Sequence, residues 1–157
     1  MIDQLNDLAS RFPDVAWEDS HGQTVAVVPR EQWFEFASAV HEASFDLCSD
    51  ITAVDWYRSR PVRFQVVANV TSTAIPAQLR MVTAVDRKDP TVASITPIWP
   101  GANFPEREAY DMFGIEFDGH PDMTRILMPD DWEGHPLRKD FGVGSVPVQF
   151  KESPKAV

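Results

Sequence analysis

The chain has 157 residues, and its 14 Lys and Arg against 24 Asp and Glu give a formal net charge of −10. This length suits one domain, and the acidic balance disfavours nonspecific binding to nucleic acid or to an anionic membrane surface, because both need clustered Lys and Arg. The single cysteine, Cys48, excludes an intrachain disulfide and any zinc or iron–sulfur site built from four thiolates of this chain.

The N-terminus lacks a signal-peptide pattern, and no apolar run reaches the roughly 18–20 residues of a membrane span, so we expect a soluble intracellular protein. Hydrophobic periodicity then predicts two helices, from Ile2 to Phe12 and from about Arg30 to Ala43. The expected strands are Val15–Glu18, Thr24–Val28, Phe45–Trp56, Arg63–Val70, Gln78–Val85 and, at a sheet edge, Ala93–Ile98. Short turns between strands favour an α+β fold for residues 1–100, with a mainly antiparallel sheet and two helices on one face.

A short helix is expected at the start of the second segment, residues 101–157, which we place in the same structural unit. Asn103 is a suitable N-cap residue, and Glu106 follows three positions later, as in a capping box. Gly114 provides the C-terminal stop. Within this helix Arg107 and Asp111 are four residues apart, a spacing that predicts an ion pair.

The chain beyond Gly114 reads as a long extended C-terminal segment, interrupted by prolines and too polar to form a core of its own. It nevertheless contains more apolar side chains than a solvated tail carries. These are Ile115, Phe117, Ile126, Leu127, Met128, Trp132, Leu137, Phe141 and Phe150. Either the segment folds back over its own sheet, or a partner protein receives it.

Two histidines of this segment, His120 and His135, lie near several carboxylates, and such groups can hold zinc or iron. Each histidine, however, sits in the same local sequence, Gly-His-Pro, and the two are 15 residues apart. Glycine and proline shape the backbone on either side, so we interpret the pair as rigid turns in which the imidazoles bond backbone groups. The sequence contains no nucleotide-binding glycine motif and no serine or cysteine nucleophile motif, so no catalytic residues are assigned.

The basic pair Arg138-Lys139 interrupts an acidic region and is flanked by Leu137 and Phe141. Arginine can pair with a partner carboxylate through two hydrogen bonds, while the apolar neighbours fill pockets beside it. We therefore interpret these four residues as an anchor for another protein.

The order of motifs after residue 105 resembles the C-type subunit of respiratory complex I, the bacterial NADH:quinone oxidoreductase. The matching sequences are Glu106–Ile115, Gly119–Asp122, Arg125–Leu127, Asp130–Trp132 and Gly134–Phe141. The resemblance implies a non-catalytic subunit of the hydrophilic arm that binds no cofactor itself. Its C-terminal segment would extend over the D-type subunit, which helps to form the quinone site and which we call the quinone-site subunit.

The resemblance also implies where the remaining parts of the electron-transport complex are found. FMN, iron–sulfur clusters, NADH and quinone would be bound by other subunits, and the partners would be the quinone-site subunit and neighbouring iron–sulfur subunits of the hydrophilic arm. The chain would be peripheral to the cell membrane, on its cytoplasmic side, without a membrane span of its own, in a proton-pumping translocase.

The resemblance assigns structural or interface roles, and no catalytic, cofactor-binding or metal-binding roles. Glu106, Arg107, Glu108 and Asp111 would form a charged network that fixes the last helix. The full set is Glu106, Arg107, Glu108, Asp111, Gly114, His120, Pro121, Arg125, Trp132, Gly134, His135, Pro136, Leu137, Arg138, Lys139, Asp140 and Phe141. The chain departs from the family pattern at Thr124, where a basic residue is usual, and at Gly142, where proline is common.

Two other interpretations compete with this one. The chain could be the corresponding subunit of a membrane-bound energy-converting [NiFe] hydrogenase, which contains a related subunit. It could instead be a stand-alone metalloenzyme that uses His120, Asp122 and His135 as ligands.

Overall fold

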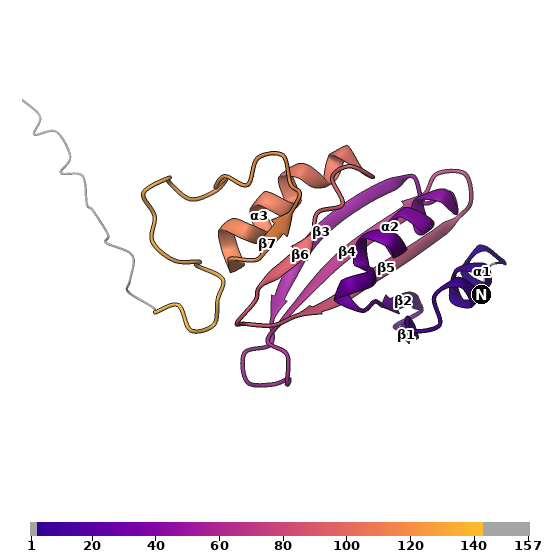
Figure 1. Ribbon diagram of the computed structural model, residues 1–157, viewed down its shortest axis with the longest axis horizontal. Coiled ribbons are helices and arrows are strands. Elements are labelled where there is room, and N and C mark those ends of the chain that lie inside the picture. Colours follow the sequence, from indigo (N-terminus) through magenta and orange to yellow (C-terminus); the bar gives the residue numbers. More distant parts are fainter. Residues whose placement is uncertain (1–2, 143–157) are drawn as a thin grey trace, which may run out of the picture.

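The computed structural model describes residues 3–142, and Figure 1 shows their arrangement. The helices are α1 (Asp3–Arg11), α2 (Trp33–Glu42) and α3 (Asn103–Phe113), and two 3-10 turns precede the latter two, η1 (Arg30–Gln32) and η2 (Pro100–Ala102). The strands are β1 (Ala16–Ser20), β2 (Gln23–Val27), β3 (Leu47–Asp55), β4 (Phe64–Ser72), β5 (Ala77–Val85), β6 (Thr91–Ala93) and β7 (Glu116–Asp118). The predicted α+β fold is confirmed.

Five strands form the main sheet, in the order β1-β2-β5-β4-β3. Neighbouring strands are antiparallel except for β2 and β5, which run parallel. The parallel pair arises because the chain leaves β2, passes through α2 and the β3–β4 hairpin, and returns as β5 beside the strand that it left. Strand β4 shows the period of two that a half-covered sheet requires, since Phe64, Val66, Ala68 and Val70 are buried and the residues between them are half-buried.

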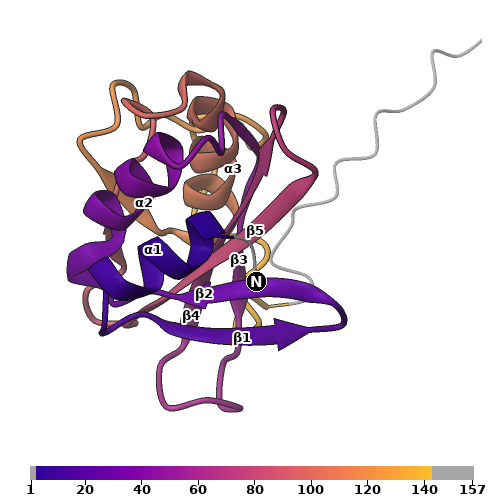
Figure 2. The same ribbon diagram turned by 90° about the vertical axis from the view of Figure 1, so that its right-hand side faces the viewer.

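Helices α1 and α2 lie on the same face of the main sheet, as Figure 2 shows. Leu8 of α1 and Trp33 and Phe36 of α2 are almost completely buried in one core cluster with the inward residues of β4. Burial of this apolar surface is the main force that holds helices on sheet. Helix α3 packs beside β3, the strand at one edge of the sheet. No helix within residues 3–142 is long and apolar enough to cross a membrane.

The edge strand expected at Ala93–Ile98 is wrong in position, because the strand found here is Thr91–Ala93. Strand β6 ends at Ala93 and pairs in parallel with β7, apart from the main sheet. The residues after Ala93 turn away from a strand conformation because Ile95 accepts backbone bonds from the amides of Ile98 and Trp99. This turn brings residues 94–96 against α3.

Candidate functional site

The residues that the motifs single out lie on α3 and on residues 119–142, which we call the tail segment. Helix α3 ends as predicted at Gly114, which has a φ of +69° and donates its amide to the Tyr110 carbonyl at 2.7 Å. The predicted capping box is wrong, because Asn103 is already helical and no side chain caps the helix start. Turn η2 leads directly into α3, so the residues before the helix already have helical dihedral angles.

Glu106 reaches across to the segment that follows β6 instead of capping its own helix. Its buried carboxylate accepts hydrogen bonds from the Ser94 hydroxyl at 2.6 Å, the Ile95 amide at 2.8 Å and the Thr96 hydroxyl at 3.0 Å. Burial raises the pKa of Glu106 above its usual value, and these donors offset only part of the effect. Glu106 thereby fastens α3 to the loop beyond β6.

Asp111 is the point at which the tail segment is fixed to α3. One carboxylate oxygen accepts the amides of three successive residues, Ile126, Leu127 and Met128, at 2.8–3.1 Å, and the other accepts Arg125 at 2.6 Å. Burial of Asp111 acts to raise its pKa, but the three amides and the arginine outweigh burial, so the pKa lies below its usual value. The carboxylate is therefore held in its charged form.

The predicted ion pair between Arg107 and Asp111 does not form. Arg107 donates to the Thr124 carbonyl at 3.1 Å, to the Thr124 hydroxyl at 2.9 Å and to the Arg125 carbonyl at 3.0 Å. Asp111 is buried and directed toward Arg125, so the two side chains serve different parts of the same turn. Thr124, one of the two departures from the family pattern, accordingly supplies two acceptors to Arg107.

The two Gly-His-Pro turns bond backbone groups through their imidazoles, as the sequence predicts. The Nε2 atom of His120 lies 3.2 Å from the Asn103 carbonyl oxygen, and its Nδ1 atom accepts a hydrogen bond from the Asp122 amide at 3.0 Å. The Nδ1 atom of His135 lies 3.0 Å from the Asp111 carbonyl oxygen, in the last turn of α3. Partial burial lowers the pKa of His135, which favours the neutral ring. Both turns are thus joined to α3.

Arg138 is directed into the chain, which corrects its predicted role as a contact for a partner carboxylate. Its guanidinium donates to the carbonyls of Phe113 and Gly114, so it neutralises the C-terminal end of α3. The adjacent Leu137 donates its amide to the Met112 carbonyl at 3.0 Å, while its side chain is 53% exposed. Of the predicted anchor, Leu137 and Lys139 are exposed, whereas Arg138 and Phe141 are half-buried.

An ion cluster at the strand ends of the β3–β4 hairpin, which we call the Arg63 cluster, holds the last described part of the tail segment; Arg63 and Asp55 are buried and Asp140 is exposed. Arg63 donates two hydrogen bonds to Asp55, at 3.0 and 2.8 Å, and two to Asp140, at 2.8 and 2.6 Å. Asp55 also accepts the Lys139 amide at 2.8 Å. Although burial opposes ionisation of Asp55, these donors lower its pKa to about 2.

Sequence reasoning missed Asp55 and Arg63, because both lie far from the motifs of the tail segment. Asp55 ends β3 and Arg63 directly precedes β4, so the hairpin sets them side by side. The sequence did contain a signal for this pair, because Asp55 and Arg63 carry opposite charges and stand at the facing ends of two predicted strands.

The polar contacts leave apolar side chains of the tail segment on the outside. Ile126, Leu127 and Leu137 are 37%, 60% and 53% exposed, and we call these three residues the tail surface. Trp132 and Phe141 stack with ring centroids 6.3 Å apart. The tail segment therefore folds back on its own chain through polar bonds, which is the first of the two possibilities, and it leaves these three apolar side chains exposed. That a partner protein receives them stays a prediction. Phe150 lies outside the described residues.

The other predicted residues occupy the outer side of the tail segment or helix. Glu108, Pro121, Gly134 and Lys139 are exposed, and Pro136 is half-buried. Gly134 has a φ of +85°, and the Phe141 ring lies against its Cα, where a side chain would collide.

The geometry gives no support to a metal site at His120, Asp122 and His135. Among residues 3–142, no three His, Cys, Asp or Glu side chains come together closely enough to hold a metal ion. The two imidazoles bond different backbone groups at opposite ends of α3.

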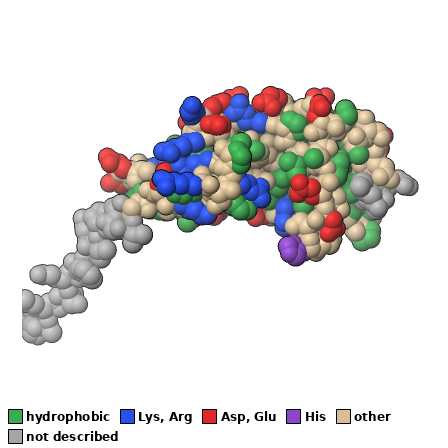
Figure 3. All heavy atoms as spheres, turned by 90° about the horizontal axis from the view of Figure 1, so that it is seen from below, with side chains coloured by type: hydrophobic (Ala, Val, Ile, Leu, Met, Phe, Trp, Pro, Cys, Tyr) green, Lys and Arg blue, Asp and Glu red, His purple; other side chains and the backbone are tan. Residues whose placement is uncertain are grey.

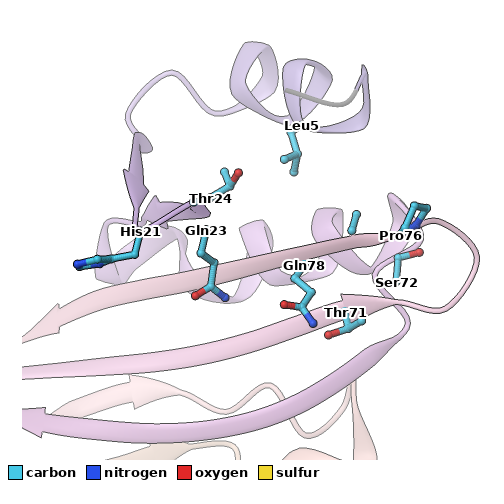
Figure 4. A pocket seen from close by; sticks show the side chains of 10 residues that line it. Leu5, His21, Gln23, Thr24, Thr71, Ser72, Pro76 and Gln78 are labelled. Atoms are coloured by element: carbon cyan, nitrogen blue, oxygen red, sulfur yellow. The ribbon is translucent and has the colours of Figure 1, made fainter.

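A cavity of about 860 Å³ lies between α1 and the ends of two hairpins of the sheet (Figure 4). Its lining is mostly small or neutral, and His21, Thr24 and Thr71 are among the residues that line it. The lining includes no carboxylate or cysteine, so this cavity does not bring together an acid–base pair or a thiol nucleophile.

Comparison with known proteins relates the whole arrangement to one family. Residues 26–146 match the family described as respiratory-chain NADH dehydrogenase, 30 kDa subunit. The chain is 52% identical over 107 residues to the C-type subunit of the NADH-quinone oxidoreductase of Salinispora arenicola, a match that covers 68% of this chain and 44% of the relative.

Two solved structures are similar to this one. A trypsin-resistant fragment of Nqo5 is 32% identical, with a TM-score of 0.70 over 76% of this chain and 98% of the fragment. A chain of the membrane-bound sulfane sulfur reductase, an archaeal respiratory membrane complex, is 22% identical, with a TM-score of 0.78 over 98% of this chain and 96% of that chain. The second likeness concerns the fold alone. The chain spans about half the length of the first curated relatives that it matches.

Proposed function

This chain belongs to the respiratory-chain NADH dehydrogenase 30 kDa subunit family, and from that membership we propose that it is a cofactor-free subunit of a proton-pumping NADH:quinone oxidoreductase. It docks on the quinone-site subunit in the hydrophilic arm, on the cytoplasmic side of the membrane, and holds that neighbour in position. Its role is to keep the quinone-site subunit in position. Such positioning matters because a misplacement of about 1 Å at a reacting centre can cost roughly a hundredfold in rate.

The tail segment is the observation that carries this proposal. Its backbone is fixed by Asp111, Arg138 and the Arg63 cluster, so the tail surface is presented in one conformation. A preorganised apolar surface binds with a smaller loss of conformational entropy than a flexible one. Exposed apolar side chains held in this way are typical of a surface that is covered in an assembly.

The single cysteine supports the proposal that cofactors are bound by other subunits. Burial raises the pKa of Cys48 to about 12, so its thiol is not available as a thiolate ligand near neutral pH. Iron–sulfur clusters are therefore assigned to partner subunits next to the quinone-site subunit, and family membership is the ground on which FMN, NADH and quinone are assigned to partner subunits as well.

The docking proposal is tested by measuring the Kd between the purified full chain and the purified quinone-site subunit. We expect Leu127→Asp and Leu137→Asp each to weaken binding by about tenfold or more, since each places a charge in an apolar contact. The matched control is Leu47→Asp, because Leu47 is 49% exposed but lies on β3 outside the tail segment. Equal Kd values for all three variants and the unaltered chain would rule out docking through the tail surface.

A second candidate is the corresponding subunit of a membrane-bound energy-converting [NiFe] hydrogenase. The fold shared with the sulfane sulfur reductase chain favours it, since one fold serves more than one respiratory complex. Purification of the native assembly separates the two candidates. Co-purifying NADH-oxidising activity supports the first, and nickel with hydrogen-oxidising activity supports the second.

A further inference from the structure

The face of the main sheet opposite α1 and α2 carries an open groove of about 750 Å³. Val27, Val82 and Val67 lie in register on the neighbouring strands β2, β5 and β4, and Thr52 of β3 continues the same row. Val27 and Val67 are half-buried, Val82 is buried and Thr52 is exposed, so the row is mostly apolar and is most accessible at its Thr52 end. No helix within residues 3–142 covers this groove, as Figure 2 shows.

Two arginines, Arg60 and Arg80, and one carboxylate, that of Glu18, line the groove. Neighbouring side chains set the positions of the two arginines. The Arg60 guanidinium stacks on the Trp56 ring, 3.8 Å from its centroid, and Trp56 is itself held by a hydrogen bond to Gln65 at 3.3 Å. Arg80 donates to Asn69 at 3.1 Å. Stacking and hydrogen bonding restrict long side chains in advance, so less rotamer entropy is lost when a partner binds.

These arginines have no acidic partner in the part of the chain that the structure describes. Neither Arg60 nor Arg80 forms an ion pair with any carboxylate among residues 3–142, and the same holds for Arg58, whose guanidinium lies 5.0 Å from the Tyr57 ring centroid. Figure 3, the view from below, shows an area in which Lys and Arg side chains gather, with Asp and Glu side chains among them. In a chain of net charge −10, such a local cationic area is the place that attracts acidic groups.

We propose that this groove is a second docking surface, which receives a segment of another subunit that carries apolar side chains flanked by Asp or Glu. The valine floor receives the apolar side chains, and Arg60 and Arg80 pair with the carboxylates. A protein segment fits better than an extended polyanion, because the acidic remainder of the chain repels a membrane surface or a nucleic acid. The inference rests on the proposed function only in placing the chain within an assembly.

Photo-crosslinking in the intact purified complex tests this proposal. Benzoylphenylalanine is introduced at Thr52, on the groove floor, and at the exposed Ser10 of α1 as a control position. We expect crosslinking from position 52 to a segment of another subunit that contains both apolar and acidic residues. Crosslinking only to lipid, to residues 143–157 of the same chain, to a segment without carboxylates, or to nothing overturns the proposal.

A pair of charge-matched variants tests the role of the arginines. Arg60→Gln combined with Arg80→Gln lowers the net charge by two, and so does Arg11→Glu on α1. We expect the first variant to reduce the crosslinking yield at position 52 by about fivefold, as the loss of two exposed ion pairs predicts, and Arg11→Glu to leave it unchanged. An equal yield in both variants overturns charge recognition at the groove. Retention of the quinone-site subunit in the same preparations shows separately whether the proposed function holds.

Discussion

Asp55, Asp111 and Glu106 are all buried, but their carboxylates are compensated in different ways. Asp55 has an arginine and two backbone amides, and Asp111 has an arginine and three amides, so both have lowered pKa values. Glu106 receives only two hydroxyls and one amide, and burial raises its pKa. A buried carboxylate with an arginine fastens a segment firmly, whereas one with neutral donors does so at a cost that depends on pH.

Glu106→Gln tests this pH-dependent cost. Because the folded pKa of Glu106 lies above its unfolded value, the unfolded chain ionises first as pH rises, and the folded state loses stability from about pH 4.5 upward until the folded pKa is passed. Glutamine has nearly the same shape and does not ionise. We therefore expect the free energy of unfolding of the variant, relative to the unaltered chain, to increase as pH rises through this window.

Urea unfolding between about pH 4 and pH 8 measures this difference, and contributions from the other carboxylates cancel because both proteins contain them. Glu108→Gln is the control, since Glu108 is exposed on the same helix. A pH-independent difference for Glu106→Gln, equal to that of the control, contradicts the interpretation.

The end of α3 is the element on which the tail segment depends. At Gly114 the chain turns in the left-handed conformation, and His135 and Arg138 pack directly against the space that a Cβ would occupy. Glycine is required here for two separate reasons, the backbone angle and the close approach of the tail segment.

Gly114→Ala separates these two reasons when it is compared with Gly22→Ala. Gly22 has a similar φ of +80°, but a Cβ there meets no atom within 4 Å. The control should lose about 1 kcal/mol from backbone strain, whereas Gly114→Ala should lose on the order of 1–3 kcal/mol more because Arg138 and His135 must move. Thermal unfolding gives the stabilities, and the rate of trypsin cleavage after Arg138 reports on the tail segment. Equal losses and equal cleavage rates in the two variants contradict this account.

At the scale of elements, sequence patterns predicted what depends on local periodicity. The three long strands, both N-terminal helices and the Gly114 helix end were found because apolar spacing and a single glycine determine them. The edge strand failed because Ser94 and the two residues after it bond Glu106, which lies on a different element. The parallel pairing of β2 and β5 likewise depends on the packing of the whole core.

The sequence pointed to many of the charged residues of the candidate site, but it did not predict which of them contact one another. The spacing of Arg107 and Asp111 is correct for a helical ion pair, but three successive backbone amides and Arg125 offer Asp111 better compensation. Arg63 and Asp140 are 77 residues apart, and their pairing depends on where the tail segment crosses the hairpin. Local rules therefore find the charged residues, and tertiary structure decides how they pair.

At the scale of the whole molecule, polar contacts fix the tail segment to the rest of the chain, Met123 and Met128 pack against the core, and the tail surface stays exposed. Large exposed apolar side chains on a segment that is held in place differ from the usual arrangement, in which apolar side chains face the core. The arrangement fixes the shape of the tail segment while leaving Leu127 and Leu137 free to be buried elsewhere. The valine-lined groove lies on other elements and shares no residue with the tail surface, so the two surfaces can serve different neighbours.

If the Arg63 cluster serves to preorganise the tail surface, then weakening it should reduce docking without changing any docking residue. Asp140→Asn removes the charge that Arg63 binds on the tail segment but leaves the tail surface intact. We expect faster proteolysis within the tail segment and an increase of about tenfold in the Kd for the quinone-site subunit, because ordering entropy is then lost on binding. Asp131→Asn, at an exposed position of the same segment, controls for the loss of one negative charge. Faster proteolysis together with an unchanged Kd would show that docking does not depend on a preorganised tail segment.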